Sequence, residues 1–227
     1  MDVGVVKVAE DSDFEKLKSL IDNNDDWKLD YSKGETNVWT KAASNTDFKM
    51  VKISTVYPDV TPQQLYDTLH DPEYRKVWDN HMIEAFDIGY LNPNNDIGYY
   101  SMSCPPPLKN RDFILQRSWL DTGEEQLIVN HSVFHRDYPA KSNYVRAISY
   151  ITGFVIRSDG ASGCSLGYVS QTDPKGTLPS WLVNKVTQIF APKCVPVEEV
   201  QLAIEEVKSP VPVSPKMAAK KGNSIEV

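Results

Sequence analysis

The N-terminal third of the chain alternates between helical and extended patterns of apolar residues. Residues 12–23 predict an amphipathic helix, because apolar side chains recur there every three or four positions and Ser12 and Glu15 have the spacing of a capping box. Three runs rich in β-branched and aromatic residues follow and predict strands: 27–31, 36–40 and 48–56.

Two more helices are predicted directly after these strands. Thr61 and Gln64 form a second capping box around a proline at the first helical position. Asp71 and the proline after it end this helix and begin a short third one that extends through Trp78.

From residue 81 to residue 172 the pattern is strand after strand. The connecting segments, rich in Asn, Asp, Pro and Gly, are too short for parallel crossovers, so the sheet is predicted to be antiparallel. Gly153 inside the longest run predicts a bulge or a sharp bend. The predicted strands are 82–91, 97–103, 111–120, 126–135, 143–157 and 164–172.

A final amphipathic helix is predicted over residues 179–207, with a kink or break at Pro192. One domain then spans residues 12–207, and residues 208–227, rich in Pro and Lys, are expected to form a disordered tail. About nine antiparallel strands make a sheet that curls, and the last helix can close its open side. Pattern alone leaves two interiors open, a packed core or a cavity for one ligand.

Composition narrows the class of partner. With 24 basic and 31 acidic side chains the net charge is −7, which argues against nucleic acid and restricts any membrane contact to a local patch. The three cysteines are widely spaced, which favours a reducing compartment. The first residues lack the apolar core of a signal peptide, and no run approaches the ~20 apolar residues of a membrane span. We expect a cytoplasmic protein.

The candidate enzyme and metal motifs lack the neighbouring elements or the spacing that their chemistry requires. Gly163 to Gly167 match the G-x-S-x-G string, but a strand, not a helix, follows the serine and no histidine occurs after His135. His131 and His135 would lie ~13 Å apart along one strand, too far to share one metal ion. We therefore expect no enzyme activity, no metal and no cofactor.

Three segments in the same order resemble the START (StAR-related lipid transfer) family, in particular its phosphatidylcholine-transfer-protein-like branch. They are 71–79 (DPEYRKVWD), 105–112 (PPPLKNRD) and 173–185 (DPKGTLPSWLVNK). The resemblance covers residues 12–193. It implies an α+β helix-grip fold, in which a curved antiparallel sheet of about nine strands wraps around a long C-terminal helix and encloses a lipid cavity.

The resemblance also implies a headgroup site. An Arg and an Asp four residues apart serve the phosphate in choline-lipid carriers, and Arg75 and Asp79 match them; this spacing also puts both side chains on one helix face. The aromatic cage of those carriers matches Tyr100, Phe113 and Tyr150. The choline carrier has Trp at the position of Tyr100 and Tyr at that of Phe113, so ethanolamine lipids are expected beside choline lipids.

The function implied is binding of one phosphatidylcholine or phosphatidylethanolamine and its transfer between membranes, with only transient membrane association. The alternative is a lipid-gated sensor or adapter without net transfer. Trp181 and Leu182, at the start of the last helix, are candidates for the membrane contact. Ser209 and Ser214 precede prolines in the tail and suit a proline-directed kinase, and the apolar C-terminus suits a PDZ groove.

Overall fold

The computed structural model describes residues 1–160 and 162–176, which form three helices and ten strands. The helices are α1 (Asp11–Asp22), α2 (Pro62–His70) and α3 (Arg75–Trp78). The strands are β1 (Lys28–Lys33), β2 (Thr36–Lys41), β3 (Met50–Tyr57), β4 (Met82–Asn92), β5 (Asn95–Met102), β6 (Asn110–Asp121), β7 (Glu125–Ser132), β8 (Tyr144–Arg146), β9 (Ile148–Ser158) and β10 (Cys164–Asp173).

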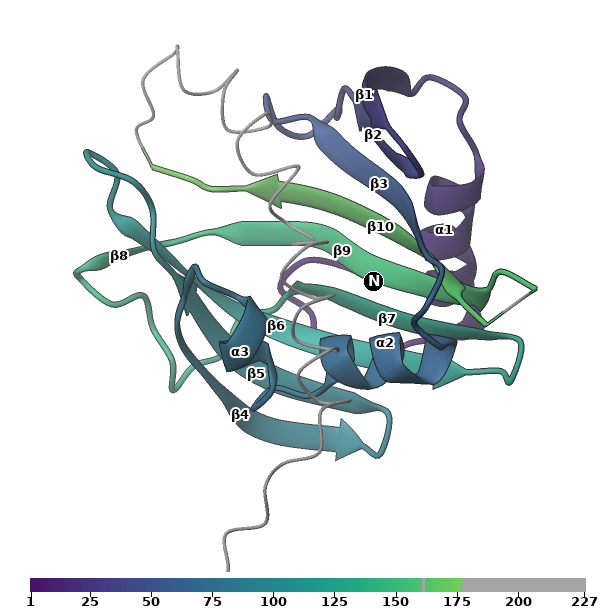
Figure 1. Ribbon diagram of the computed structural model, residues 1–227. Helices are drawn as coiled ribbons and strands as arrows, with labels where there is room; N and C mark the ends of the chain where they lie inside the picture. The colour runs from purple at the N-terminus through teal and green to yellow at the C-terminus, as the bar shows by residue number, and fades with distance from the viewer. Residues whose placement is uncertain (161, 177–227) are drawn as a thin grey trace, which may run out of the picture.

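Nine of these strands form one curved antiparallel sheet in the order β1-β2-β3-β10-β9-β7-β6-β5-β4 (Figure 1). Most strands pair with their neighbours in sequence. The exceptions are β3 and β4, which α2 and α3 connect and which do not pair, and β8; β10 lies between β3 and β9. The predicted antiparallel sheet of about nine strands is confirmed along this path.

One expected strand is in fact two. The run over 143–157 is divided at Ala147, and its first part, β8, pairs with β6 in parallel, so the antiparallel prediction is wrong for this pair. The buried Asp112 carboxylate explains the pairing, because it accepts two hydrogen bonds of 3.0 Å from the Arg146 guanidinium. The Ala147 N–H then donates to the Asp112 carbonyl, which fixes the chain beside β6.

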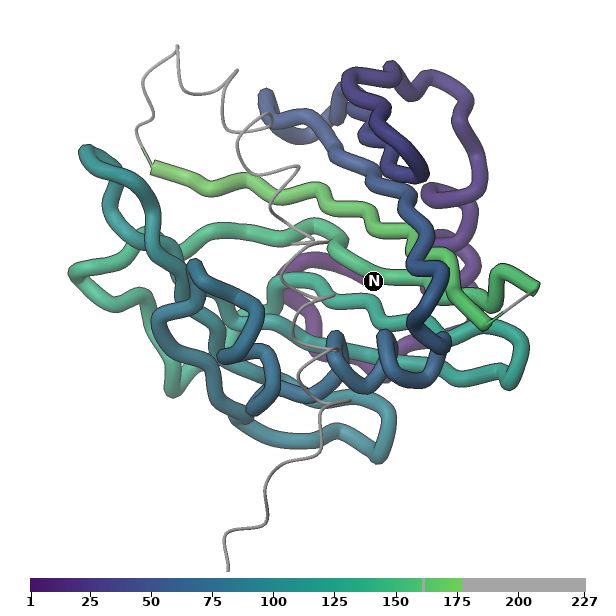
Figure 2. Tube along the Cα trace, viewed as in Figure 1, coloured from purple at the N-terminus to yellow at the C-terminus, as the bar shows by residue number. Residues whose placement is uncertain are grey.

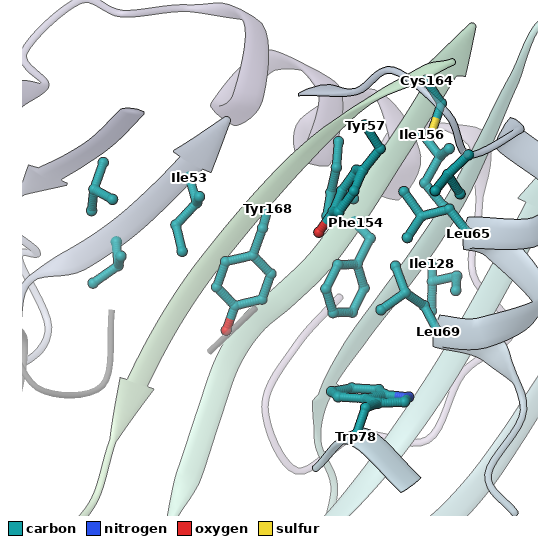
Figure 3. Close-up of a cluster of buried hydrophobic side chains, with 14 residues drawn as sticks. Ile53, Tyr57, Leu65, Leu69, Trp78, Ile128, Phe154, Ile156, Cys164 and Tyr168 are labelled. Atoms are coloured by element: carbon teal, nitrogen blue, oxygen red, sulfur yellow. The ribbon is translucent and has the colours of Figure 1, made fainter. Parts of the chain in front are cut away.

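Helices α2 and α3 cover one face of the sheet, which we call the α2 face (Figure 1). Leu65 and Leu69 of α2 and Trp78 of α3 pack on alternate residues of the central strands, as the two-residue repeat of a strand requires (Figure 3). The buried cluster contains Val38, Val51, Ile53, Tyr57, Val60, Leu65, Leu69, Trp78, Ile128, Phe154, Ile156, Cys164, Leu166 and Tyr168.

Helix α1 packs on the opposite face through Phe14 and Leu17. Gly153 allows this close approach, because a Cβ there would lie 2.7 Å from the Ile128 carbonyl oxygen and 2.8 Å from Leu17 Cδ1. Of the two alternatives predicted at Gly153, a bulge or a sharp bend, the bulge is wrong, since Gly153 stays in register with both neighbouring strands. The register of β9 with β10 shifts instead at Tyr150, which has no partner residue in β10.

The two helix starts differ in how well the sequence predicted them. The capping box at Thr61 is confirmed, since its hydroxyl accepts the Gln64 N–H. The predicted capping box at Ser12 is wrong, because α1 begins one residue earlier, at Asp11. Glu10 is the N-cap and donates its N–H to Asp13 Oδ2 at 3.0 Å. An acidic side chain at the third helical position can therefore set the start without a serine cap.

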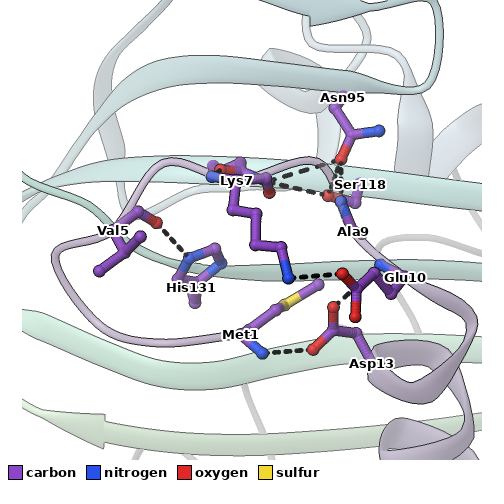
Figure 4. A network of polar contacts seen from close by, with 10 residues as sticks. Met1, Val5, Lys7, Ala9, Glu10, Asp13, Asn95, Ser118 and His131 are labelled. Atoms are coloured by element: carbon purple, nitrogen blue, oxygen red, sulfur yellow. Dashed lines mark hydrogen bonds and ion pairs between the residues drawn. The ribbon is translucent and has the colours of Figure 1, made fainter.

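Residues 1–9 run along the face opposite α2, behind the strands in the view of Figure 2. They form one isolated bridge to the sheet, and buried side chains hold the rest of their backbone (Figure 4). The contacts are Gln116 with Lys7, Asn95 with Ala9, and His131 with Val5. Polar side chains inside the sheet thus replace a strand partner for this segment.

The predicted helix over 179–207 and the predicted tail over 208–227 lie outside the described residues. Within the part described, no helix is long and apolar enough to span a membrane.

Candidate headgroup site

The predicted Arg75–Asp79 pair is formed on the α2 face. Arg75 is the first residue of α3 and Asp79 its C-cap, and Arg75 Nε donates to Asp79 Oδ2 at 2.9 Å. The Asp79 side chain is 10% exposed and that of Arg75 is 35% exposed. The ion pair uses only Nε, so the two terminal amino groups of a partly open guanidinium are not used by it.

Tyr100 completes this pair. Its hydroxyl donates to Asp79 Oδ2 at 2.9 Å, and its ring lies 4.6 Å from Arg75 Cζ. The Trp78 ring lies 5.2 Å from the same carbon. The guanidinium is therefore fixed by one carboxylate and stacked against two aromatic rings, an environment that Arg suits better than Lys.

Burial and the interactions among Arg75, Asp79 and Tyr100 together keep Arg75 and Tyr100 protonated. Burial by itself lowers the pKa of Arg75, but its interactions with Tyr100 and Asp79 outweigh burial and raise it. Burial is the main reason why the pKa of Tyr100 is raised; Asp79 raises it further and Arg75 opposes the change. Arg75 thus stays cationic and Tyr100 stays protonated, as a donor to Asp79 must.

The predicted aromatic cage is only partly assembled by the described contacts. Phe113 of β6 is the cross-strand partner of Tyr100, with ring centroids 6.1 Å apart and tilted by 42°. Tyr150 is half-buried at the register shift of β9, and no described contact joins it to either ring.

The Asn-Arg-Asp sequence at the start of β6 holds the loops around it in place. Asn110 Oδ1 accepts the Cys104 N–H at 3.1 Å, which closes the loop between β5 and β6. The buried Arg111 donates to the carbonyls of Pro174 and Lys175, at 3.0 Å each. The chain directly after β10 is thereby fixed to the start of β6, two residues from Phe113.

The other sequence candidates fall elsewhere. Trp181, Leu182, Ser209 and Ser214 lie outside the described residues. Ser165, from the G-x-S-x-G string, lies within β10 and pairs with Val56 and Arg157, so no helix follows it. Across residues 1–160 and 162–176, no group of three His, Cys, Asp or Glu side chains could hold a metal ion.

Two polar features of the α2 face were not predicted. One is the ion pair between Arg117 of β6 and Asp96 of β5. The other is a row of hydroxyls on β9 and β10 that includes Thr152 and Ser170. Their only signal in the sequence is a polar residue at an inward position of a strand, and strand pairing is what brings them together.

Comparison with known proteins agrees with this architecture. The family model described as the START domain matches residues 7–195. The chain belongs to the START domain family. Mouse START domain-containing protein 10 is 46% identical to it over 191 residues, which are 84% of this chain and 66% of that protein. Rat phosphatidylcholine transfer protein is 27% identical over 163 residues, 70% of this chain and 75% of that protein.

These matches confirm the family and the branch expected from the three sequence segments. The chain spans just under two thirds of the length of the mouse and human START domain-containing protein 10. It is therefore compared with part of those proteins only.

Solved structures confirm the fold class. The crystal structure of human STARD10 superimposes with a TM-score of 0.82 at 43% identity, covering 89% of this chain and 82% of that one. Human StAR-related lipid transfer protein 5 gives 0.80 at 16% identity, covering 88% and 96%, and shows the fold alone. The chain thus has the START fold.

Proposed function

We propose that this protein binds one molecule of phosphatidylcholine or phosphatidylethanolamine and carries it between membranes, without catalysis. The observation that carries this proposal is the Arg75 guanidinium, which Asp79 fixes through Nε while its two terminal amino groups stay outside the ion pair. A planar guanidinium held in one orientation suits the oxygens of a phosphate. Arg75 therefore holds the lipid phosphate, and Asp79 orients Arg75.

The amine of the headgroup is proposed to bind at Tyr100, Phe113 and Tyr150. Ammonium groups of choline or ethanolamine are attracted to aromatic faces. One ring is already engaged, because Arg75 stacks 4.6 Å from the Tyr100 ring. A cage with less free aromatic surface discriminates less between amines, so choline and ethanolamine lipids are carried within about tenfold of each other. A preference for choline above about a hundredfold contradicts this part.

Transfer follows from the energetics of the acyl chains. About 30 methylenes at ~0.8 kcal/mol each oppose the escape of a diacyl lipid into water by ~24 kcal/mol. A protein that buries the chains removes most of this barrier without any covalent step. The name of the relative phosphatidylcholine transfer protein supports the proposal. We also propose a cytoplasmic location with transient membrane contact.

Native mass spectrometry of the purified protein tests binding and names the headgroup. Arg75→Gln and Asp79→Asn are expected to reduce phospholipid loading roughly tenfold without unfolding, because a phosphate loses its cation or the cation loses its support. Lys76→Gln is the matched control, since Lys76 is the next residue in α3 and its one ion pair among the described residues is with the exposed Glu73. Equal loading of all four proteins contradicts the headgroup assignment.

A vesicle transfer experiment separates the carrier from a lipid-gated sensor. Donor vesicles contain labelled phosphatidylcholine or phosphatidylethanolamine, and acceptor vesicles contain none. A carrier accelerates the appearance of label in the acceptors in proportion to protein concentration. Protein that loads lipid but does not accelerate transfer is a sensor, and the transfer function is then wrong.

A further inference from the structure

A row of polar side chains crosses the α2 face at one level of the sheet. The residues occupy directly paired positions in five neighbouring strands, so all of them face the same side. In order across the sheet they are Ser170 of β10, Thr152 of β9, Asn130 of β7, Arg117 of β6 and Asp96 of β5. We call these five residues the polar row.

The polar row lies between two different surfaces. On one side, two positions along β7 and β9 and ~7 Å away, lie the buried residues Ile128 and Phe154, which belong to the cluster packed against α2. On the other side of the polar row lies Phe113 of the proposed headgroup site. It is four positions from Arg117 along β6, or ~13 Å. From the cation and rings the α2 face thus continues past Leu115 of β6 to the polar row, and from there to the apolar cluster under α2.

One end of the polar row is satisfied internally. Arg117 Nε lies 3.3 and 3.2 Å from the two Asp96 oxygens, and Nη1 donates to the His70 carbonyl at 2.6 Å. The carboxylate is buried and the guanidinium side chain is 21% exposed. This pair anchors the end of α2 to the sheet and neutralises its own charge, so it offers a ligand little.

The other end keeps hydrogen-bond capacity. Thr152 Oγ1 lies 3.0 Å from both Ser170 Oγ and Ser149 Oγ, and Ser170 Oγ lies 3.1 Å from Thr172 Oγ1. Four hydroxyls have four donors, and the three bonds among them use three. The Asn130 amide adds two N–H donors and has no hydrogen-bond partner among the described contacts. Neutral donors therefore remain, in a half-buried position.

The order of these surfaces matches the order of groups in a diacyl glycerophospholipid. Its phosphate is followed by two ester carbonyls, which are neutral acceptors, and then by the acyl chains. We propose that Asn130, Thr152 and Ser170 form a subsite that donates hydrogen bonds to the ester carbonyl oxygens. This inference rests on the proposed function, since it assigns the part of the same ligand between headgroup and chains.

Competition between two lipids tests the subsite. Purified protein is offered equal amounts of dioleoyl phosphatidylcholine and the dialkyl ether lipid with the same headgroup and chain length, which lacks both carbonyls. Native mass spectrometry counts each complex. The wild-type protein is expected to prefer the diester about tenfold, the effect of one to two neutral hydrogen bonds. Asn130→Leu/Thr152→Val is expected to bind both lipids within about twofold, because it lacks two of the three proposed donors and the third, the Ser170 hydroxyl, still has Thr172 Oγ1 as a hydrogen-bond partner at 3.1 Å.

Two variants make the outcome specific. Thr152→Ser keeps the hydroxyl and is expected to keep the preference. Ser165→Ala removes a hydroxyl from β10 on the opposite face and is expected to change nothing, since Ser165 alternates with the α2-face residues Cys164 and Leu166.

The results are distinguishable from a failure of the proposed function. If neither lipid loads, phospholipid binding itself is wrong. If both load equally on the wild-type protein, or if the double variant keeps a tenfold preference, the hydroxyls and the amide do not bind carbonyls and the subsite is overturned.

Discussion

The Tyr100 hydroxyl donates a 2.9 Å hydrogen bond to Asp79, on the carboxylate oxygen that also accepts the Arg75 Nε–H. One oxygen thus links a strand of the sheet to helix α3, and Tyr100 positions Arg75 twice, through this carboxylate and through its ring. The aromatic residue at position 100 consequently affects both the proposed phosphate-binding group, Arg75, and the ring surface proposed to bind the amine.

Tyr100→Phe is expected to lower phospholipid loading about three- to tenfold, because Asp79 loses a hydrogen bond while the stacking surface stays. Native mass spectrometry under limiting lipid measures the loss. Tyr90→Phe is the chemical control, since the exposed Tyr90 hydroxyl also donates to a carboxylate, that of Asp87, at 2.9 Å. Equal loading of both variants and the wild type would show that this hydrogen bond does not support Arg75.

Tyr100→Trp is expected to shift selectivity toward choline. An indole presents a larger and more strongly attractive face to a quaternary ammonium, and the family resemblance places Trp at this position in the choline carrier. The ratio of phosphatidylcholine to phosphatidylethanolamine transferred in a competition experiment should rise about fivefold. A ratio that stays the same, with normal total transfer, refutes this role for position 100.

Gly153→Ala is expected to destabilise the fold by about 1–3 kcal/mol, because the new methyl group would lie 2.7 Å from the Ile128 carbonyl oxygen. Chemical denaturation measures the free energy of unfolding. Gly89→Ala is the control in another strand, where a Cβ meets no atom within 4 Å. If the two variants are equally stable, α1 does not depend on the missing side chain.

Tyr57→Phe is expected to leave stability unchanged or to raise it by about 1 kcal/mol. The Tyr57 hydroxyl is buried without a hydrogen-bond partner in the part of the chain that the structure describes, and burial raises its pKa. Removing it therefore relieves a desolvated group inside the α2-face cluster. Thermal unfolding checks this, and a drop in the melting temperature would reveal a bond that the hydroxyl makes.

His131→Gln is expected to weaken the dependence of stability on pH below about 6.5. Burial lowers the pKa of His131, although its bond to the Val5 carbonyl acts in the opposite direction. The unfolded chain then binds a proton that the folded chain resists, so wild-type stability falls as pH falls through the folded pKa. Denaturation of both proteins at pH 7.5 and 5.5 compares the slopes, and parallel losses exclude His131 as a cause.

Local patterns predicted most of the fold, because each strand and helix is specified by residues close together in sequence. Thr61 and Gln64, three positions apart, fixed the start of α2. The errors concern contacts made over long distances. No residue near Gly153 in the sequence indicates that Leu17 will pack against it. Likewise, the pairing of β8 with β6 depends on the hydrogen bonds from Arg146 to Asp112.

The same division applies to the site. Arg75 and Asp79 are four residues apart on one short helix, so their pairing could be predicted from spacing and family resemblance together. The hydrogen bond from Tyr100 could not, because it depends on where α3 lies on β5. The resemblance offered Tyr150 as a third ring, yet the register shift beside it decides where that ring points.

Residues 1–9 have a consequence for the order of folding. The side chains that hold this segment are Asn95, Gln116 and His131, between 86 and 126 residues further along the chain. The segment consequently has no stable position until β5, β6 and β7 have assembled. It therefore docks late in folding, and the entropic cost of closing this long loop arises in the last step. Its amide protons should exchange before those of the sheet, through openings that leave the α2 face intact.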